Sequence, residues 1–152
     1  MINRRAVAAL TLSAAGFLSL LQSEGYTSRA VIPIKGDVPT IGFGTTAGVK
    51  MGDTITPQAA VSRALSDVSK FEGALKRCVK VPLTQGEYDA YLSLSYNIGS
   101  GAFCGSTLVR KLNAGDYAGA CEEIKRWDKA GVRRVQGLTA RRHREYAQCR
   151  QS

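Results

Sequence analysis

Hydrophobic side chains recur every three or four residues through most of the chain after residue 56, which predicts amphipathic helices. Thr56 followed by Pro57 is typical of a helix start, and this helix should end near Cys78. Thr84 and Glu87 have the spacing of a capping box, which predicts the start of the next helix. Three further helices are predicted: one over Ser106 to Asn113, one capped by Asp116, and one capped by Thr139 and ending near Cys149.

The stretch from Val31 to Phe43 has a different pattern. Its apolar residues are interrupted by Pro33, Gly36 and Pro39, as in the hairpins of a small sheet, and we expect one strand over residues 40–44. Strands precede the helices instead of alternating with them. The pattern therefore predicts one compact α+β domain, mostly helical, with a small sheet near its start.

An uncharged run of sixteen residues, Ala6 to Leu21, follows Arg4 and Arg5 near the N-terminus. It is short and rich in Ala, Gly and Ser, whereas a stable membrane span needs about 20 strongly apolar residues. A cleaved signal peptide, a core helix and a weak membrane anchor all fit this run. We favour an anchor that inserts, then leaves the membrane and packs as the helix leading to Glu24.

Composition narrows the class of protein. The chain has 152 residues, of which 44% are hydrophobic and 22% charged, as in a globular domain. Its net charge of +9 favours a polyanionic partner such as nucleic acid, anionic lipid or the bacterial envelope. Basic residues are scattered apart from a cluster near the C-terminus, and no nucleic-acid-binding motif accompanies them, so we expect no nucleic-acid partner.

Four cysteines occur without a CxxC pair, so the usual spacing of a metal site is missing. Disulfides would require an oxidising compartment, and four reduced core cysteines in a cytosolic protein are the alternative. Four cysteines allow three pairings. Of these we select Cys104 with Cys121 and Cys78 with Cys149 as the prediction.

Two carboxylates and a hydroxyl lie near a glycine-rich turn, in Glu24, Asp37 and Thr40. Hydrolysis of a glycosidic bond needs a protonated carboxyl group as general acid and a second group that stabilises the sugar cation or activates water. Glu24 suits the acid, because an apolar setting and the negative end of a helix both favour a protonated carboxyl group. Asp37 is otherwise an ordinary turn residue, and Thr40 an ordinary strand residue.

Gly42 and Gly44 stand at alternate positions, where the absence of side chains on one face would let a sugar ring approach the backbone.

The single histidine, His143, lies in an arginine-rich segment without a partner motif. No nucleotide-binding glycine motif is present either. We therefore expect neither a metal nor another cofactor.

Several motifs, in this order, resemble the phage-type lysozymes of glycoside hydrolase family 24. The resemblance extends from about Phe17 onward and covers most of the chain. The motifs are Glu24-Gly25, Pro39-Thr40-Ile41-Gly42-Phe43-Gly44-Thr45-Thr46, Val81-Pro82-Leu83-Thr84-Gln85, Tyr96-Asn97-Ile98-Gly99, the stretch from Ser106 to Tyr117, Arg126-Trp127 and Gly137-Leu138-Thr139-Ala140-Arg141-Arg142.

The resemblance implies a lysozyme-like fold, with a small N-terminal sheet lobe and a larger helical lobe. It also implies a muramidase that cleaves the β-1,4 bond between N-acetylmuramic acid and N-acetylglucosamine in peptidoglycan, for host lysis. The family's Glu and Thr correspond to Glu24 and Thr40. Its Asp commonly stands nearer the Glu, where this chain has Pro33, so Asp37 is the available carboxylate. Substrate contacts are expected at Gly42, Gly44, Thr45 and Asn97.

Some members of this family carry a signal-anchor-release segment, and residues 4–21 resemble one. This implies a boundary between residues 1–22, the anchor and first helix, and residues 23–152, the catalytic domain. The protein would be tethered to the host inner membrane and then released to the periplasm, acting as a monomer on peptidoglycan. A cationic protein that binds the wall or disrupts membranes, with a degenerate site, is the alternative.

Overall fold

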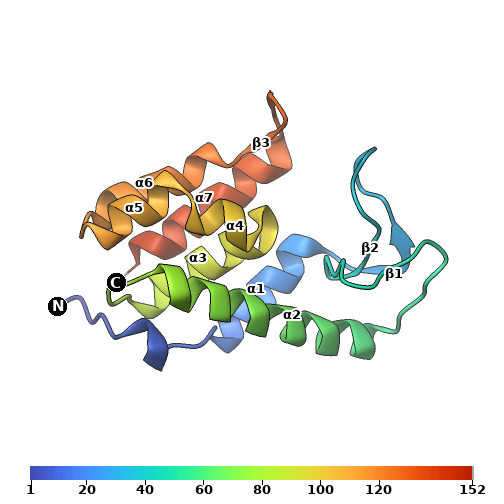
Figure 1. Ribbon diagram of the computed structural model, residues 1–152, viewed down its shortest axis with the longest axis horizontal. Helices are drawn as coiled ribbons and strands as arrows, with labels where there is room; N and C mark the ends of the chain where they lie inside the picture. Colours follow the sequence, from blue (N-terminus) through green and yellow to red (C-terminus); the bar gives the residue numbers. More distant parts are fainter. Residues whose placement is uncertain (152) are drawn as a thin grey trace. The chain divides into compact units, whose positions relative to one another are not determined.

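Helices make up most of the computed structural model, which describes residues 1–151 (Figure 1). The chain divides into two compact units. The first, here called the helical unit, joins residues 1–16 to residues 71 onward. The second, here called the hairpin unit, is formed by residues 17–70. Two helices contribute to both units: α1 (Ala14–Glu24) and α2 (Pro57–Cys78).

The helical unit is built around a central helix, α3, which carries fully buried Tyr88, Tyr91 and Leu92. Helix α7 packs against α3, and α6 packs against α5 (Figure 1). The elements of this unit beyond α1 and α2 are the 3-10 helix η1 (Val7–Ala9), α3 (Gln85–Ile98), α4 (Ser100–Cys104), α5 (Thr107–Asn113), α6 (Tyr117–Glu123), the 3-10 helix η2 (Ile124–Arg126), β3 (Lys129–Ala130), β4 (Arg133–Arg134) and α7 (Gln136–Arg150).

Side-chain caps begin three of these helices where the sequence predicts them. Thr84 and Glu87 form a complete capping box at the start of α3, with the Glu87 amide donating to Thr84 Oγ1 at 3.0 Å. Ser106 accepts from the Val109 amide before α5, and Asp116 caps α6. The predicted boundaries of α2 are also confirmed.

The predicted cap of the last helix is wrong. Helix α7 begins at Gln136, three residues before Thr139, with Val135 at the N-cap position. The Thr139 hydroxyl lies 3.2 Å from both Asp128 Oδ2 and the Val135 carbonyl oxygen. Thr139 therefore bonds back to the preceding turn of the helix and does not cap its first amides.

The predicted disulfide pairing is also wrong. The structure contains Cys78–Cys104 and Cys121–Cys149 instead of Cys104–Cys121 and Cys78–Cys149. Cys104 ends α4 beside the last turn of α2, and its Cα lies 5.6 Å from that of Cys78. Helices α6 and α7 pack together, which places Cys121 and Cys149 with their Cα atoms 5.8 Å apart.

Helix α7 buries two arginines around one carboxylate. Arg142 is 1% exposed and Arg141 is 4% exposed, and both pair with Glu145 at 2.8–3.2 Å. Ser93 also donates to this carboxylate, at 2.7 Å. Burial raises the pKa of Glu145, and the charges of Arg142 and Arg141 oppose that rise. Arg141 and Arg142, two of the basic residues clustered near the C-terminus, are therefore buried and do not form part of an exposed basic surface.

The hairpin unit contains β1 (Thr27–Val31) and β2 (Thr40–Gly42), which pair antiparallel (Figure 1). Ala30, Ile41 and Val49 form its small buried cluster, with Ile55 packed against them. The expected strand over residues 40–44 ends early at Gly42. The chain turns there, and the amides of residues 41 and 45 donate to each other's carbonyl oxygens at 2.9 and 3.0 Å.

The uncharged N-terminal run is not one helix. After η1, residues 10–13 are not helical, and α1 then runs from Ala14 to Glu24. The expectation that a helix leads to Glu24 is confirmed. Among residues 1–151, no helix combines the length and apolar character that crossing a bilayer requires.

Candidate functional site

Glu24 is the last residue of α1, and its side chain is partly buried. Leu20, one turn earlier, is 2% exposed and anchors this end of the helix in the protein. The Gly25 amide donates to the Leu21 carbonyl oxygen at 3.0 Å, after which the chain enters β1. Packing at Leu20 and the turn at Gly25 therefore fix where the carboxylate leaves the helix.

The register of the hairpin places Thr40 at the end of β2 away from Thr27, which is the β1 residue nearest to Glu24 in sequence. Thr27, three residues after Glu24, pairs with Gly42, and Val31 pairs with Thr40. Because β2 has only three residues, Thr40 lies two residues from the position that faces Thr27. The Thr40 hydroxyl is partly exposed and donates to the Val38 carbonyl oxygen at 3.3 Å.

Asp37 lies in the connection between the two strands, residues 32–39, and is exposed. Its amide donates to the Ile34 carbonyl oxygen at 2.9 Å, in a turn at the Val31–Thr40 end of the hairpin. Asp37 thus shares the Thr40 end of the hairpin, whereas Glu24 precedes the Thr27 end. Its catalytic role stays a prediction.

The missing side chain of Gly42 has a packing reason within the hairpin unit. A Cβ atom at this residue would lie 3.0 Å from Ala60 Cβ, and its φ of +64° also disfavours other residues. Gly44, with a φ of +81°, belongs to the turn that follows β2. The bare face expected at Gly42 therefore accommodates α2, and the predicted sugar contacts of both glycines stay predictions.

The two other expected substrate residues lie in different units. Thr45 is 2% exposed, and its hydroxyl donates to Asp67 Oδ2 at 2.7 Å within the hairpin unit. This bond holds the turn after β2 on α2. Asn97 is exposed near the end of α3 in the helical unit, two residues before its C-cap. Substrate contact by either residue stays a prediction.

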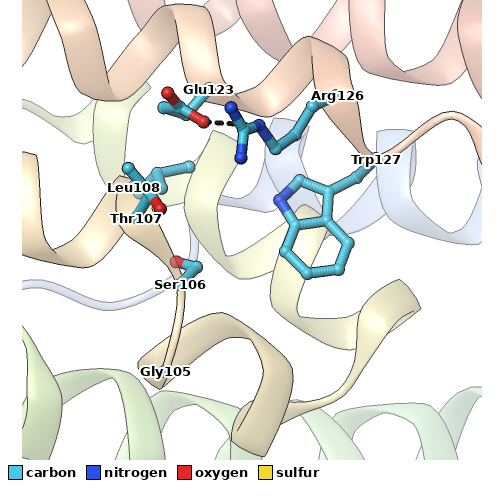
Figure 2. A pocket seen from close by; sticks show the side chains of 7 residues that line it. All are labelled: Gly105, Ser106, Thr107, Leu108, Glu123, Arg126 and Trp127. Carbon is cyan, nitrogen blue, oxygen red and sulfur yellow. Dashed lines mark ion pairs between the residues drawn. The ribbon is translucent and has the colours of Figure 1, made fainter.

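The helical unit also contains a pocket of about 310 Å³, which Figure 2 shows from close by. The side chains of Arg126 and Trp127 border it, and Arg126 Nε pairs with Glu123 at 2.7 Å. Lys111 pairs with the same carboxylate at 2.8 Å, so the buried charge of Glu123 is compensated twice. The lining residues are Gly105, Ser106, Thr107, Leu108, Glu123, Arg126 and Trp127.

The sequence pattern indicates Trp127 as a member of a helix capped by Asp116 and, with Arg126, of a family motif, but it does not predict this pocket. A signal was nevertheless present, because Glu123 and Arg126 have the i,i+3 spacing of an ion pair on one helical face. An indole beside a guanidinium suits a carbohydrate that carries carboxylates, since the indole offers a flat apolar face and the guanidinium binds carboxylate oxygens.

Comparison with known proteins gives a consistent set of matches. The phage lysozyme family matches residues 21–145. The endolysin of Salmonella phage P22 is 38% identical over 143 residues, which are 91% of this chain and 97% of that protein. The SAR-endolysin of Pseudomonas phage phiKMV is 36% identical over 146 residues, covering 93% of this chain and 88% of that protein.

Solved structures agree. An endolysin from Escherichia coli O157:H7 phage FAHEc1 has a TM-score of 0.82 at 36% identity, and the match covers 93% of this chain and 94% of that chain. The α+β architecture expected from the sequence is thus confirmed. Fold and matches together define a lysozyme-type hydrolase. The chain belongs to the phage lysozyme family.

Proposed function

We propose that this protein is an endolysin that hydrolyses the β-1,4 bond between N-acetylmuramic acid and N-acetylglucosamine in peptidoglycan. The observation that carries the proposal is the position of Glu24, which ends α1 directly before the hairpin in a chain of the phage lysozyme family. The relatives named endolysin support the substrate.

In this mechanism Glu24 protonates the glycosidic oxygen as the leaving group departs. A water molecule held by Thr40 and Asp37 then attacks the sugar carbon, and the proton that this water loses passes to the Asp37 carboxylate. Thr40 has its hydroxyl at the edge of β2, and Asp37 has an exposed carboxylate three residues earlier. No metal enters the scheme, because two carboxyl groups and a hydroxyl supply the acid and the water-binding groups.

The charge of the protein fits its proposed target. A net charge of +9 attracts the protein to the anionic bacterial envelope and raises its local concentration there. Such attraction is screened by salt, so the apparent affinity for whole cells should fall as ionic strength rises. A protein that binds the cell wall without cleaving it would show the same electrostatic attraction, so charge does not distinguish the two functions.

We also infer that residues 4–21 tether the protein to the host inner membrane before release to the periplasm. Relatives named SAR-endolysin support this, including those of Pseudomonas phage phiKMV and Enterobacteria phage P21. Arg4 and Arg5 would keep the N-terminus on the cytoplasmic side. The apolar run is broken at residues 10–13 in the structure, so tethering requires this segment to refold as a membrane helix.

Analysis of the products of purified peptidoglycan tests the enzymatic proposal. Incubation with the protein should release soluble muropeptides whose new reducing ends are N-acetylmuramic acid, detected by borohydride reduction and mass spectrometry. Protein that sediments with the wall while producing no reducing ends would instead support the wall-binding alternative. New ends at N-acetylglucosamine would contradict the assigned bond.

A further inference from the structure

Arg4 holds the N-terminal segment, residues 4–13, against the rest of the helical unit through a bidentate ion pair with Glu87. Arg4 Nε and Nη2 each donate to a different oxygen of Glu87, both at 3.0 Å. The Glu87 side chain is 4% exposed, and the centre of the Arg4 guanidinium lies 3.5 Å from the centroid of the Tyr117 ring. This hydrogen bonding raises the pKa of Arg4, although burial opposes it. Such bidentate pairing is specific in geometry.

The next residue fixes the register of the segment through its backbone. The Arg5 amide donates to the Leu83 carbonyl oxygen at 2.8 Å, and the Leu83 amide donates back at 2.8 Å. The Arg5 side chain is exposed and donates to Gln85 Oε1 at 3.4 Å. Arg4 and Arg5 therefore carry the same charge but contribute differently to the packed structure.

A second carboxylate receives the segment where α1 begins. The Ser13 amide donates to Asp89 Oδ1 at 3.1 Å, and the Ser13 hydroxyl also bonds to this carboxylate. The Leu12 amide donates to Glu72 Oε2 at 3.0 Å. Asp89 is 5% exposed, so its charge is compensated mainly by donors inside the protein.

The segment is tightly packed at Leu10 and at Gly16, in the first turn of α1. Leu10 is 1% exposed, and a Cβ atom at Gly16 would lie 2.8 Å from Asp89 Cγ and 2.9 Å from Leu12 Cδ1. The first turn of α1 thus rests on the Asp89 side chain.

We propose that Glu72, Glu87 and Asp89 form a receiving site for residues 4–13, and that this site competes with the lipid bilayer for the segment. The inference rests on the proposed tethering, and it names what draws the segment out of the membrane. A bilayer-inserted helix uses its backbone donors internally, so it leaves these carboxylates without Arg4 and without the amides of residues 12 and 13. Docking restores all of these bonds.

Substitution in the receiving site separates docking from anchoring, because it leaves the membrane segment unchanged. Asp89→Asn in the full chain keeps the size of the side chain and removes its charge. The ratio of membrane-bound to released protein in fractionated bacteria should rise about five- to thirty-fold. Glu122→Gln is the control: it removes the same charge from an exposed residue of the helical unit and should leave the ratio unchanged. A ratio that Asp89→Asn does not change contradicts the receiving site.

Hydrogen exchange on the released wild-type protein gives a test that needs no substitution. The amides of Arg5, Leu12 and Ser13 should exchange slowly, because each donates to a group of the helical unit. Exchange at the rate of an unfolded peptide would contradict docking. If wild-type protein is never found in the membrane fraction, the tethering proposal fails, while hydrogen exchange still reports on the receiving site.

Discussion

The helical unit and the hairpin unit are stabilised in different ways. The helical unit combines α3, most of whose residues are buried, with two disulfides and the Arg141–Glu145–Arg142 cluster. The hairpin unit has a small cluster at Ala30, Ile41 and Val49. Between its strands, Ile32, Ile34 and Val38 are 46%, 56% and 59% exposed.

The difference separates a densely packed unit from the hairpin unit, which contains the three residues proposed to be catalytic. A unit with a dense buried core opens rarely, whereas a short hairpin with few buried contacts belongs to the less stable end of a structure. Glu24 stands at the start of that hairpin, and Thr40 and Asp37 lie within it. Substitutions in the helical unit should therefore change stability first, and those at the site should change activity first.

The largest effect on stability is expected at the buried arginine cluster. Glu145→Gln removes the carboxylate that two buried guanidinium groups share, and should lower the free energy of unfolding by about 3–5 kcal/mol in urea titrations. Glu122→Gln, at an exposed glutamate bonded to Lys125 and Tyr146, is the control and should change little. Equal effects of the two substitutions would contradict the structural role of Glu145.

A smaller effect is expected at the contact between β2 and α2. Gly42→Ala combines an unfavourable φ with a Cβ atom 3.0 Å from Ala60, and should cost about 2–3 kcal/mol. Gly48 has a similar φ, +71°, but open space around it, so Gly48→Ala should cost only about 1–2 kcal/mol. Thermal unfolding of the two variants measures the difference, and indistinguishable values would refute the packing argument.

The smallest effect is expected in the connection between the strands. Ile34→Ser replaces a side chain that is 56% exposed, and the free energy of unfolding should change by less than about 0.5 kcal/mol. Leu92→Ser, at a fully buried position of α3, is the contrasting variant and should be strongly destabilising. A large loss of stability in Ile34→Ser would show that the connection is packed against other residues.

Helix boundaries could be predicted from the sequence where a side chain caps the backbone. Thr84 and Asp116 cap α3 and α6 as predicted, and Ser106, predicted as the first residue of a helix, caps α5; each cap depends only on residues three apart in sequence. Thr139 was predicted to cap the last helix in the same way, and this prediction is wrong. Its hydroxyl bonds to Asp128, and that partner is brought near by the fold of the β3–β4 hairpin.

Long-range features could not be predicted in this way. Disulfide pairing depends on which helices pack together, and four cysteines in sequence carry no such information. The burial of Arg141 and Arg142 could not be predicted either, because a run of basic residues usually indicates a solvated face. At the site, the end of α1 at Glu24 was predicted, but the close approach of Ala60 to Gly42 depends on how α2 packs against β2 and could not be predicted.

The central claim is that Glu24 supplies the catalytic proton, and the activity of Glu24→Gln tests it most directly. With Glu24→Gln, a suspension of purified peptidoglycan should lose turbidity at least about 100-fold more slowly than with the wild-type protein, because Gln cannot act as a general acid. Its melting temperature should stay within about 3 °C, since Glu24 is only partly buried. Clearing within a few-fold of the wild-type rate would contradict the claim.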